Sequence, residues 1–338
     1  MGNALVKQGK IGVSPQAAWG TASASTYNSA KYNASTLPML DNAPTLEARE
    51  MVGDSSVTSA VGRSYFDGEG SLKTLSFESY LNVGTLPDHV GGALQDFAAV
   101  TNLYTYSPED SVIDFQANEG NLYSIYKQWG STSADPMLLL NAIIGDITFS
   151  LDNTASGVAH LMTMSGNWTG TKIENMDGAE QGVVNVAGDY SISESNEKWY
   201  LIWNDGVDTY TDTCFYNFSL NISNNVEGVC KGAGNFRNYR IKPTMTVTFD
   251  VPHLTAMEGA TQQAFDGAEM SFSLRNYSGT LDPSNEGEIQ FQATNMICTA
   301  SPVAESNGYE SISIQAELLR NDTTGWSEPL ISFYTAIS

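Results

Sequence analysis

The sequence predicts an all-β protein with short flanking helices, built as two similar halves in tandem. Short runs that alternate apolar and polar residues recur along the chain, and clusters of Gly, Asn, Asp and Ser separate them. The order strand, strand, helix, strand, hairpin occurs twice. With 338 residues, 41% of them hydrophobic, the chain has enough apolar surface to offset the entropy lost on ordering. We therefore expect a folded protein with a large core.

Three runs carry the strand prediction. Residues 71–81, "SLKTLSFESYL", give a β-like setting to Leu72, Leu75 or Phe77, and Leu81. Residues 245–251, "MTVTFDV", predict one apolar face made of Met245, Val247 and Phe249. Residues 311–318, "SISIQAEL", predict a half-buried strand with two faces: Ile312, Ile314, Ala316 and Leu318 on one, and Ser311, Ser313, Gln315 and Glu317 on the other.

Two segments interrupt the β pattern and predict short amphipathic helices that cover one sheet face. In "PDHVGGALQDFAAV" (87–100), Pro87 suits a first helical turn, and apolar residues follow at helical spacing: Val90, Leu94 and Phe97. In "HLTAMEGATQQAF" (253–265) the same spacing is given by Leu254, Met257, Ala260 or Thr261, and Ala264 or Phe265.

The repeated order of elements predicts four segments. We expect an extended N-terminal arm at 1–44, a first β domain at 45–172, a polar connector with a strand or two at 173–208, and a second β domain at 209–338. Each domain contains an apolar strand, a polar hairpin turn that ends in Gly (153–157 and 305–308) and another strand. A period of this length indicates two fused domains rather than a solenoid.

The charge balance excludes some functions. The chain has 15 Lys and Arg against 38 Asp and Glu, a net charge of -23, which argues against binding nucleic acid by neutralising phosphate. The N-terminal residues do not read as a secretory signal, and no run of about 18 apolar residues predicts a membrane span. Without a signal, we expect three free thiols, Cys214, Cys230 and Cys298, and no use of the six N-x-S/T triplets for glycosylation.

A search for chemistry finds no catalytic, cofactor-binding or metal-binding pattern, so we do not expect an enzyme. No carboxylate or Cys stands at metal-ligand spacing beside the three histidines, His89, His160 and His253. Carboxylate pairs such as Glu109 with Asp110, or Asp205 with Asp208, are expected in solvated loops rather than in a glycosidase site. "DNTASG" and "DPSNEGE" lack the calcium-loop register.

One aromatic cluster leaves two interpretations open. In "KWYLIWNDG" (198–206), Trp199, Tyr200 and Trp203 could stack on sugars, or they could belong to a strand core or a subunit interface. The second interpretation is the commoner one for such residues.

Several stretches resemble the tail tube (major tail) proteins of long-tailed bacteriophages. The resemblance begins with "GKIGVSPQAAWGTAS" (9–23) and continues through 37–81, where a Pro-containing segment and a polar loop lead into a strand. It resumes in "LLLNAIIGDITFSLDNTASGVAHLMTMSGNWTG" (138–170) and in the C-terminal half. It covers most of the chain. The departures are the long polar connector and the low Lys and Arg content.

This resemblance implies tandem β-sandwich or barrel domains of the tail-tube type and a structural role in the virion tail. Subunits would join their sheet edges into rings, and the rings would stack into a hollow conduit for viral DNA. A two-domain chain closes such a ring with three copies, as a pseudo-hexamer. The implied partners are the chain itself, the tape measure protein and other tail proteins, with assembly in the host cytoplasm. DNA would pass without specific binding, because an acidic lumen repels phosphate.

Other functions stay open from the sequence alone. The main alternative is a β-sandwich that binds glycans or a receptor through the cluster at 198–206. Another virion β-protein, such as a tail terminator or decoration protein, and an enzyme are the remaining classes. We also expect the N-terminal arm and the hairpins at 153–157 and 305–308 to make contacts between subunits or rings.

Overall fold

The computed structural model describes most of the β-rich body of the chain. The described residues are 10–21, 26–30, 46–50, 63–67, 72–81, 85–100, 103–108, 120–129, 134–153, 161–175, 182–184, 199–212, 215–228, 231–232, 235–236, 239–240, 243–252, 269–277, 281, 287–301, 303–306, 309–319 and 330–334. They form twenty-five strands and one helix, so the all-β prediction is confirmed.

An N-terminal sheet forms one side of the molecule. Its strands pair in the order β12 (Gly182–Val184), β2 (Thr26–Ala30), β1 (Lys10–Pro15), β8 (Tyr123–Trp129), β9 (Ala134–Asp152) and β11 (Lys172–Asn175). All pairs are antiparallel except β12 with β2. The segment expected as an extended arm therefore contains two paired strands, and Ile11 and Val13 lie in the core.

A layer of six antiparallel strands continues from the second part of β9. The order is β5 (Lys73–Tyr80), β10 (Thr163–Gly170), β9, β15 (Asn217–Ser223), β20 (Thr244–Pro252) and β24 (Tyr309–Leu318). We call this the long layer. Beyond β24, its edge is completed by β23 (Val303–Ser306) and by the end of β22 (Ile289–Ala300).

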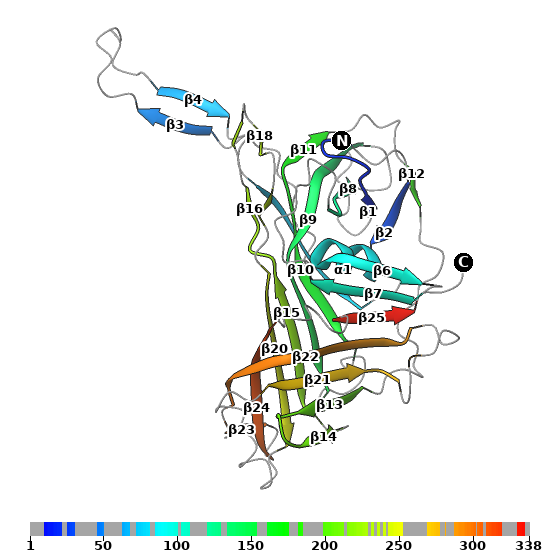
Figure 1. The fold of residues 1–338 in the computed structure, drawn as a ribbon. Coiled ribbons are helices and arrows are strands. Elements are labelled where there is room, and N and C mark those ends of the chain that lie inside the picture. Colours follow the sequence, from blue (N-terminus) through cyan, green and yellow to red (C-terminus); the bar gives the residue numbers. More distant parts are fainter. Residues whose placement is uncertain are drawn as a thin grey trace.

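A second layer crosses the long layer, as Figure 1 shows. Its strands pair in the order β14 (Thr209–Asp212), β13 (Tyr200–Asn204), β21 (Met270–Arg275), β22, β25 (Ile331–Tyr334), β7 (Leu103–Pro108) and β6 (Gln95–Val100). We call this the cross layer. Strand β22 belongs to both layers, so the two are one continuous sheet that folds over on itself.

Aromatic side chains from the two layers meet in one core. Phe149 of the long layer lies 5.1 Å, between ring centroids, from Phe291 of the cross layer. Phe218 lies 5.8 Å from Phe272 in the same way. One cluster of buried apolar side chains runs from Ile11 to Phe333 and joins the expected first and second domains. Because strands from both expected domains occur in both layers, the tandem duplication is not confirmed.

Helix α1 (Leu86–Leu94) confirms the first predicted helix but is shorter than expected. Pro87 occupies its first turn, and it ends at Gln95, whose φ of 67° breaks the helical backbone. Phe97, which we expected on the helix, lies in strand β6. A methyl group at Gly92 would lie 2.8 Å from the Trp168 ring, so glycine permits the close packing of helix on sheet. The second predicted helix, at 253–265, lies outside the described residues.

The polar alternation in the sequence is confirmed on three strands. Leu75 and Phe77 of β5 face the core, as do Met245, Val247 and Phe249 of β20. On β24 the four apolar residues that were expected on one face are all buried. Leu72 instead packs on the opposite side of the sheet, against Leu122 and Ile143. Ser311, expected on the polar face, is buried.

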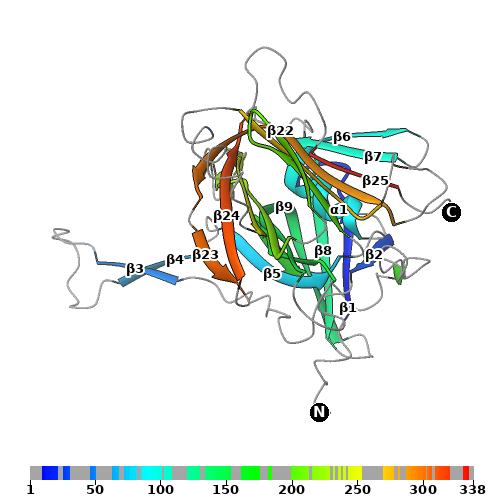
Figure 2. The same cartoon turned by 90° about the horizontal axis from the view of Figure 1, so that it is seen from below.

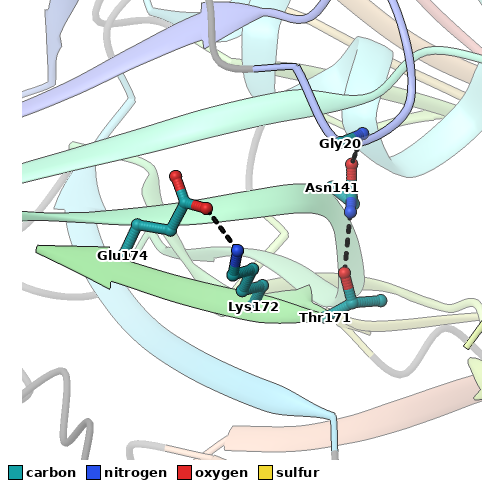
Figure 3. A network of polar contacts seen from close by, with 5 residues as sticks. All are labelled: Gly20, Asn141, Thr171, Lys172 and Glu174. Atoms are coloured by element: carbon teal, nitrogen blue, oxygen red, sulfur yellow. Dashed lines mark hydrogen bonds and ion pairs between the residues drawn. The ribbon is translucent and has the colours of Figure 1, made fainter. Parts of the chain in front are cut away.

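Asn141 marks the point at which β9 passes from the N-terminal sheet into the long layer. Its φ of 53° bends the strand, a conformation that Asn tolerates better than most residues. Figure 3 shows its amide oxygen accepting from the backbone N–H of Gly20 at 2.8 Å, while its amide nitrogen donates to Thr171 at 2.7 Å. The exposed ion pair of Lys172 with Glu174 lies close by. These contacts fix the N-terminal segment to the bend.

Three small hairpin sheets complete the described structure. Strands β3 (Leu46–Glu50) and β4 (Arg63–Asp67) form a hairpin that projects from the body in Figures 1 and 2. Between β15 and β20, β16 (Glu227–Gly228) pairs with β19 (Tyr239–Arg240), and β17 (Lys231–Gly232) pairs with β18 (Asn235–Phe236). These last four strands form one nested hairpin at the upper end of the long layer (Figure 1).

Candidate functional site

The outward side of the long layer is the most distinctive surface of the described structure. In every strand, core residues alternate with mostly polar residues that face away from the cross layer. We call this surface the acidic face; it consists of Thr74, Ser76, Glu78, Tyr80, Asp146, Thr148, Ser150, Asp152, Thr163, Ser165, Asn167, Asn217, Ser219, Asn221, Ser223, Thr244, Thr246, Thr248, Asp250, Ser313, Gln315 and Glu317.

The register of the strands aligns the polar residues of the acidic face in rows that run across the strands. One row begins with Glu78 and ends with Glu317. Five of its residues are carboxylates, and none of these described residues is Lys, Arg or His. The surface therefore carries negative charge with no compensating cation of its own.

Amide and hydroxyl groups orient the carboxylates of the acidic face. Asp146 accepts a hydrogen bond from the amide nitrogen of Asn167 at 2.8 Å and another from the hydroxyl of Ser223. Asp250 accepts from the amide nitrogen of Asn217 at 2.8 Å. Because these donors are neutral, they fix the carboxylates without cancelling their charge.

The two edges of the long layer lie open in the described structure. Among the described strands, β5 pairs with β10 alone and β23 pairs with β24 alone. Each edge carries an exposed apolar side chain: Tyr80 on β5 is 57% exposed and Ile297 on β22 is 38% exposed. Unpaired strand edges of this kind accept a strand from another chain.

The outward side of the cross layer differs in chemistry. Gln290 accepts a hydrogen bond from the hydroxyl of Tyr277 at 2.5 Å and donates to Ser273 at 3.1 Å. The guanidinium of Arg275 lies 5.6 Å from the centroid of the Tyr277 ring. We call the surface around these four residues the amide face.

The aromatic cluster at 198–206 belongs to the core of the fold. Trp199 is 3% exposed and Trp203 is 1% exposed, whereas Tyr200 is half-buried on the amide face. Trp203 stacks on Tyr210 at 4.4 Å between ring centroids. Both tryptophans are therefore closed to a sugar, and the end of the expected connector is a core strand.

Asp205 is a structural residue of the turn between β13 and β14. We expected a solvated loop, but its side chain is fully buried. One carboxylate oxygen accepts from the backbone N–H groups of Val207 and Asp208, at 2.9 and 2.8 Å, and the other accepts from the hydroxyl of Tyr210 at 3.2 Å. Burial raises the pKa of Tyr210 to about 12, and the charge of Asp205 adds to this effect.

His89 and Cys298 are also buried. His89 donates from Nδ1 to the carbonyl oxygen of Thr85 at 2.7 Å, and its ring packs edge-on against Phe77. Burial lowers the pKa of His89 to about 4. Cys298 is a free buried thiol whose pKa is raised by burial. The other two histidines and two cysteines lie outside the described residues, as do Glu109 and Asp110.

No group of three or more potential metal ligands occurs among the described residues. Within the same part of the chain, the structure contains no helix long and apolar enough to cross a membrane. The sequence matches no known protein-family model, and no curated protein shows significant similarity to it.

The acidic face could have been found from the sequence. In β15, "NFSLNIS", and in β20, "TMTVTFDVP", as far as Asp250, every second residue is Asn, Ser, Thr or Asp. The signal is the absence of Lys and Arg from these polar positions, which are normally where a solvated strand carries them. The sequence does not show that these strands lie next to one another.

Proposed function

We propose that the chain is a structural subunit of a viral tail tube, and that the acidic face lines the lumen. The acidic face is the observation that carries the proposal. A sheet surface with five carboxylates and no base among its described residues repels phosphate at close range, within a Debye length of about 8 Å at physiological salt. DNA could slide over such a wall without binding to it.

Ring closure would use the open edges of the long layer. The edge at β5 of one copy would meet the edge at β23 and β22 of the next, which satisfies backbone groups that otherwise face solvent. The acidic faces of neighbouring copies would then form one continuous inner wall. Tyr80 and Ile297 would be buried at the joint.

A repeated pairing order supports a ring of three copies. In the first half, β5 pairs with β10 and β10 pairs with β9; in the second half, β20 pairs with β24 and β24 pairs with β22. The counterpart of the open strand β5 is thus β20, which β15 covers within the same chain. One chain would supply two similar sectors of the ring, and three copies would form a pseudo-hexamer.

Several segments are available for contacts beyond the ring. The β3–β4 hairpin projects from the body (Figure 1), and in the proposed ring it would contact a neighbouring copy. Within the expected N-terminal arm, β1 and β2 already pair with strands of the same chain; most other residues of the arm lie outside the described residues, and so do most residues of the hairpin turns at 153–157 and 305–308. In this function the partners are further copies, the tape measure protein and other tail proteins, and assembly takes place in the host cytoplasm.

Electron microscopy of the purified protein at high concentration tests the function. We expect hollow stacked rings, with three copies around the lumen in end-on class averages. Six copies per ring would keep the tube function and remove the pseudo-hexamer. Monomers at every concentration would contradict the proposal and favour the glycan- or receptor-binding module, although Trp199 and Trp203 are too buried to serve it.

A charge reversal tests the position of the acidic face. Asp250→Lys places a cation on this face, whereas Asp96→Lys makes the same change at an exposed position of β6 in the cross layer. Tubes of Asp250→Lys should retain short duplex DNA at low salt, because Lys attracts phosphate. Tubes of Asp96→Lys should retain no more than the wild type. Equal retention by the two variants would show that the acidic face does not line the lumen.

A further inference from the structure

The last described strand, β25, completes the cross layer from a distant part of the chain. It lies between β22 and β7 and pairs with both in antiparallel register (Figure 1). Strands β6 and β7 pair with each other, and among the described strands only β25 joins them to the rest of the cross layer. Without β25, the layer would have a gap one strand wide between β22 and β7. We call this gap the β25 slot.

The β25 slot holds its strand by side-chain packing as well as by backbone pairing. All four side chains of β25 are buried. The ring of Phe333 stacks on two rings of β7, with centroids 5.6 Å from Tyr104 and 5.7 Å from Tyr106 and planes within 10° of each. The slot therefore fits the sequence "ISFY", which every copy of the chain carries.

The connection that leads to β25 is longer than its own chain requires. Where it begins, the N–H of Leu319 donates to the carbonyl oxygen of Asn295 on β22 at 3.0 Å. Where it ends, the N–H of Gln292, also on β22, donates to the carbonyl oxygen of Leu330 at 2.9 Å. These two anchor points lie about 10 Å apart along β22, whereas a stretch as long as residues 320–329 can extend for about 35 Å. This length allows β25 to reach a slot in an adjacent copy.

We propose that neighbouring copies exchange β25, so that the strand of one copy fills the β25 slot of the next copy in the ring. The occupant is a second copy because the slot fits this strand and every copy supplies one. The contacts are the same within a chain and between chains, so the exchange costs little. Copies held side by side also present the strand at high effective concentration. This inference rests on the proposed tube function, which brings the copies together.

Paired cysteines report which chain fills the slot in the full-length protein. Ser332 of β25 and Thr105 of β7 are direct partners in the register. Residues in such positions have Cα atoms about 4.5–5.5 Å apart, which suits a disulfide. In the variant Ser332→Cys with Thr105→Cys, oxidation therefore joins β25 to the chain whose slot it fills. Non-reducing gel electrophoresis distinguishes a bond within one copy from a bond between two.

Oxidation before and after assembly should give different products. Single copies in dilute solution should cross-link within the chain. In assembled rings the band of single copies should be lost, and the largest covalent species should contain as many copies as microscopy counts around the lumen, because the exchange closes with the ring. Copies that are oxidised before assembly keep β25 in their own slot, so tubes formed from them should fall apart faster on dilution.

A second cysteine pair is the matched control. Ala98→Cys with Thr105→Cys keeps one of the two new cysteines and pairs it across β6 and β7, which are neighbouring strands of one chain. It should cross-link within single copies before and after assembly, and its oxidation should not change how long tubes last on dilution. The wild type gives the background from the native thiols. Circular dichroism checks that each variant is folded, and Tyr334→Cys with Leu103→Cys provides an independent pair.

The outcomes separate this inference from the function on which it rests. Rings whose copies cross-link only within the chain would overturn the exchange and leave the tube function in place. Covalent species with more copies than one ring would overturn the exchange between neighbours in a ring. Covalently joined copies in a protein that forms no rings would support the exchange and contradict the tube function. Single copies at every concentration, cross-linked within the chain, would contradict both.

Discussion

The two outward faces of the molecule have the same backbone architecture and different side-chain chemistry. The acidic face carries hydroxyl, amide and carboxylate groups and no base among its described residues; these groups hydrogen-bond in a cluster around Asp146 and in pairs such as Asn221 with Thr148 at 2.8 Å. The amide face carries a connected cluster around Gln290 and places Arg275 beside Tyr277. Stability does not require this difference, because either chemistry solvates a sheet. Under the tube function proposed above, only the acidic face would line the lumen, and the contrast fits that proposal.

The largest expected effect comes from the core that the two faces share. Phe249 is fully buried between the layers, and Phe249→Ala should reduce the free energy of unfolding by about 3–5 kcal/mol, from lost burial and the cavity left behind. Guanidinium unfolding followed by Trp fluorescence and by far-UV circular dichroism measures it. The two signals should shift together, since one core joins both layers. Separate shifts would indicate two independent domains.

A smaller effect should follow from pH at the helix that packs between the layers. His89 titrates near 6.5 when unfolded and at about 4 when folded, so the unfolded state binds its proton first as the pH falls. The contribution of His89 is fully present above pH 6.5 and is lost between pH 6.5 and 4, by about 3 kcal/mol. Unfolding curves across this range measure the loss.

A matched variant isolates the histidine in that experiment. His89→Gln cannot titrate and can still donate to the carbonyl oxygen of Thr85. The difference in stability between wild type and variant should therefore change between pH 6.5 and 4. A difference that stays constant would show that His89 is not a buried neutral residue.

On the amide face, one side chain should contribute measurably to stability. Gln290→Ala removes the acceptor of Tyr277 and the donor to Ser273, and it should cost about 1 kcal/mol of unfolding free energy. Chemical denaturation measures this directly. Tyr277→Phe removes only one of these bonds, so its cost should be the smaller of the two.

On the acidic face, the smallest effect is expected. Thr246 is exposed, and Thr246→Val keeps the branched shape that suits a strand while it removes a hydroxyl. The free energy of unfolding should change by less than about 0.5 kcal/mol. A loss as large as that of Gln290→Ala would mean that the polar residues of the acidic face serve the fold, and the contrast between the faces would lose its meaning.

The sequence predicts those parts of the fold that depend on local pattern. The alternation in β20 and β24 places their core residues correctly, because side chains of a strand point to opposite faces in turn. The local sequence pattern could not predict the residue at which α1 ends. Gln95 adopts a φ of 67° there because its chain turns directly into β6, and its amide nitrogen donates to the carbonyl oxygen of Gly92 at 2.9 Å.

The arrangement of the layers could not be predicted, because it depends on pairing between distant segments. Strand β25 joins β22 to β7, so residues near 331 complete a sheet begun near 103. The sequence likewise allowed a core strand at 198–206, where Trp199 and Trp203 are buried, but it placed this strand in a polar connector and did not show that it pairs with β21. The acidic face depends on both kinds of information. The alternation of its polar residues can be seen in the sequence, but the pairing that brings its strands side by side cannot.

In the proposed tube, strand β9 would have a mechanical consequence, because the wall would have to withstand ejection of the contents. Measured along the chain, its 19 residues extend for about 60 Å at the usual rise per residue, with a bend at Asn141, and they hydrogen-bond to β8 and β11 in one part and to β10 and β15 in the other. A pull along this strand loads both sets of hydrogen bonds in shear, so many must break together. The molecule should therefore resist tension applied along β9 better than tension applied across it.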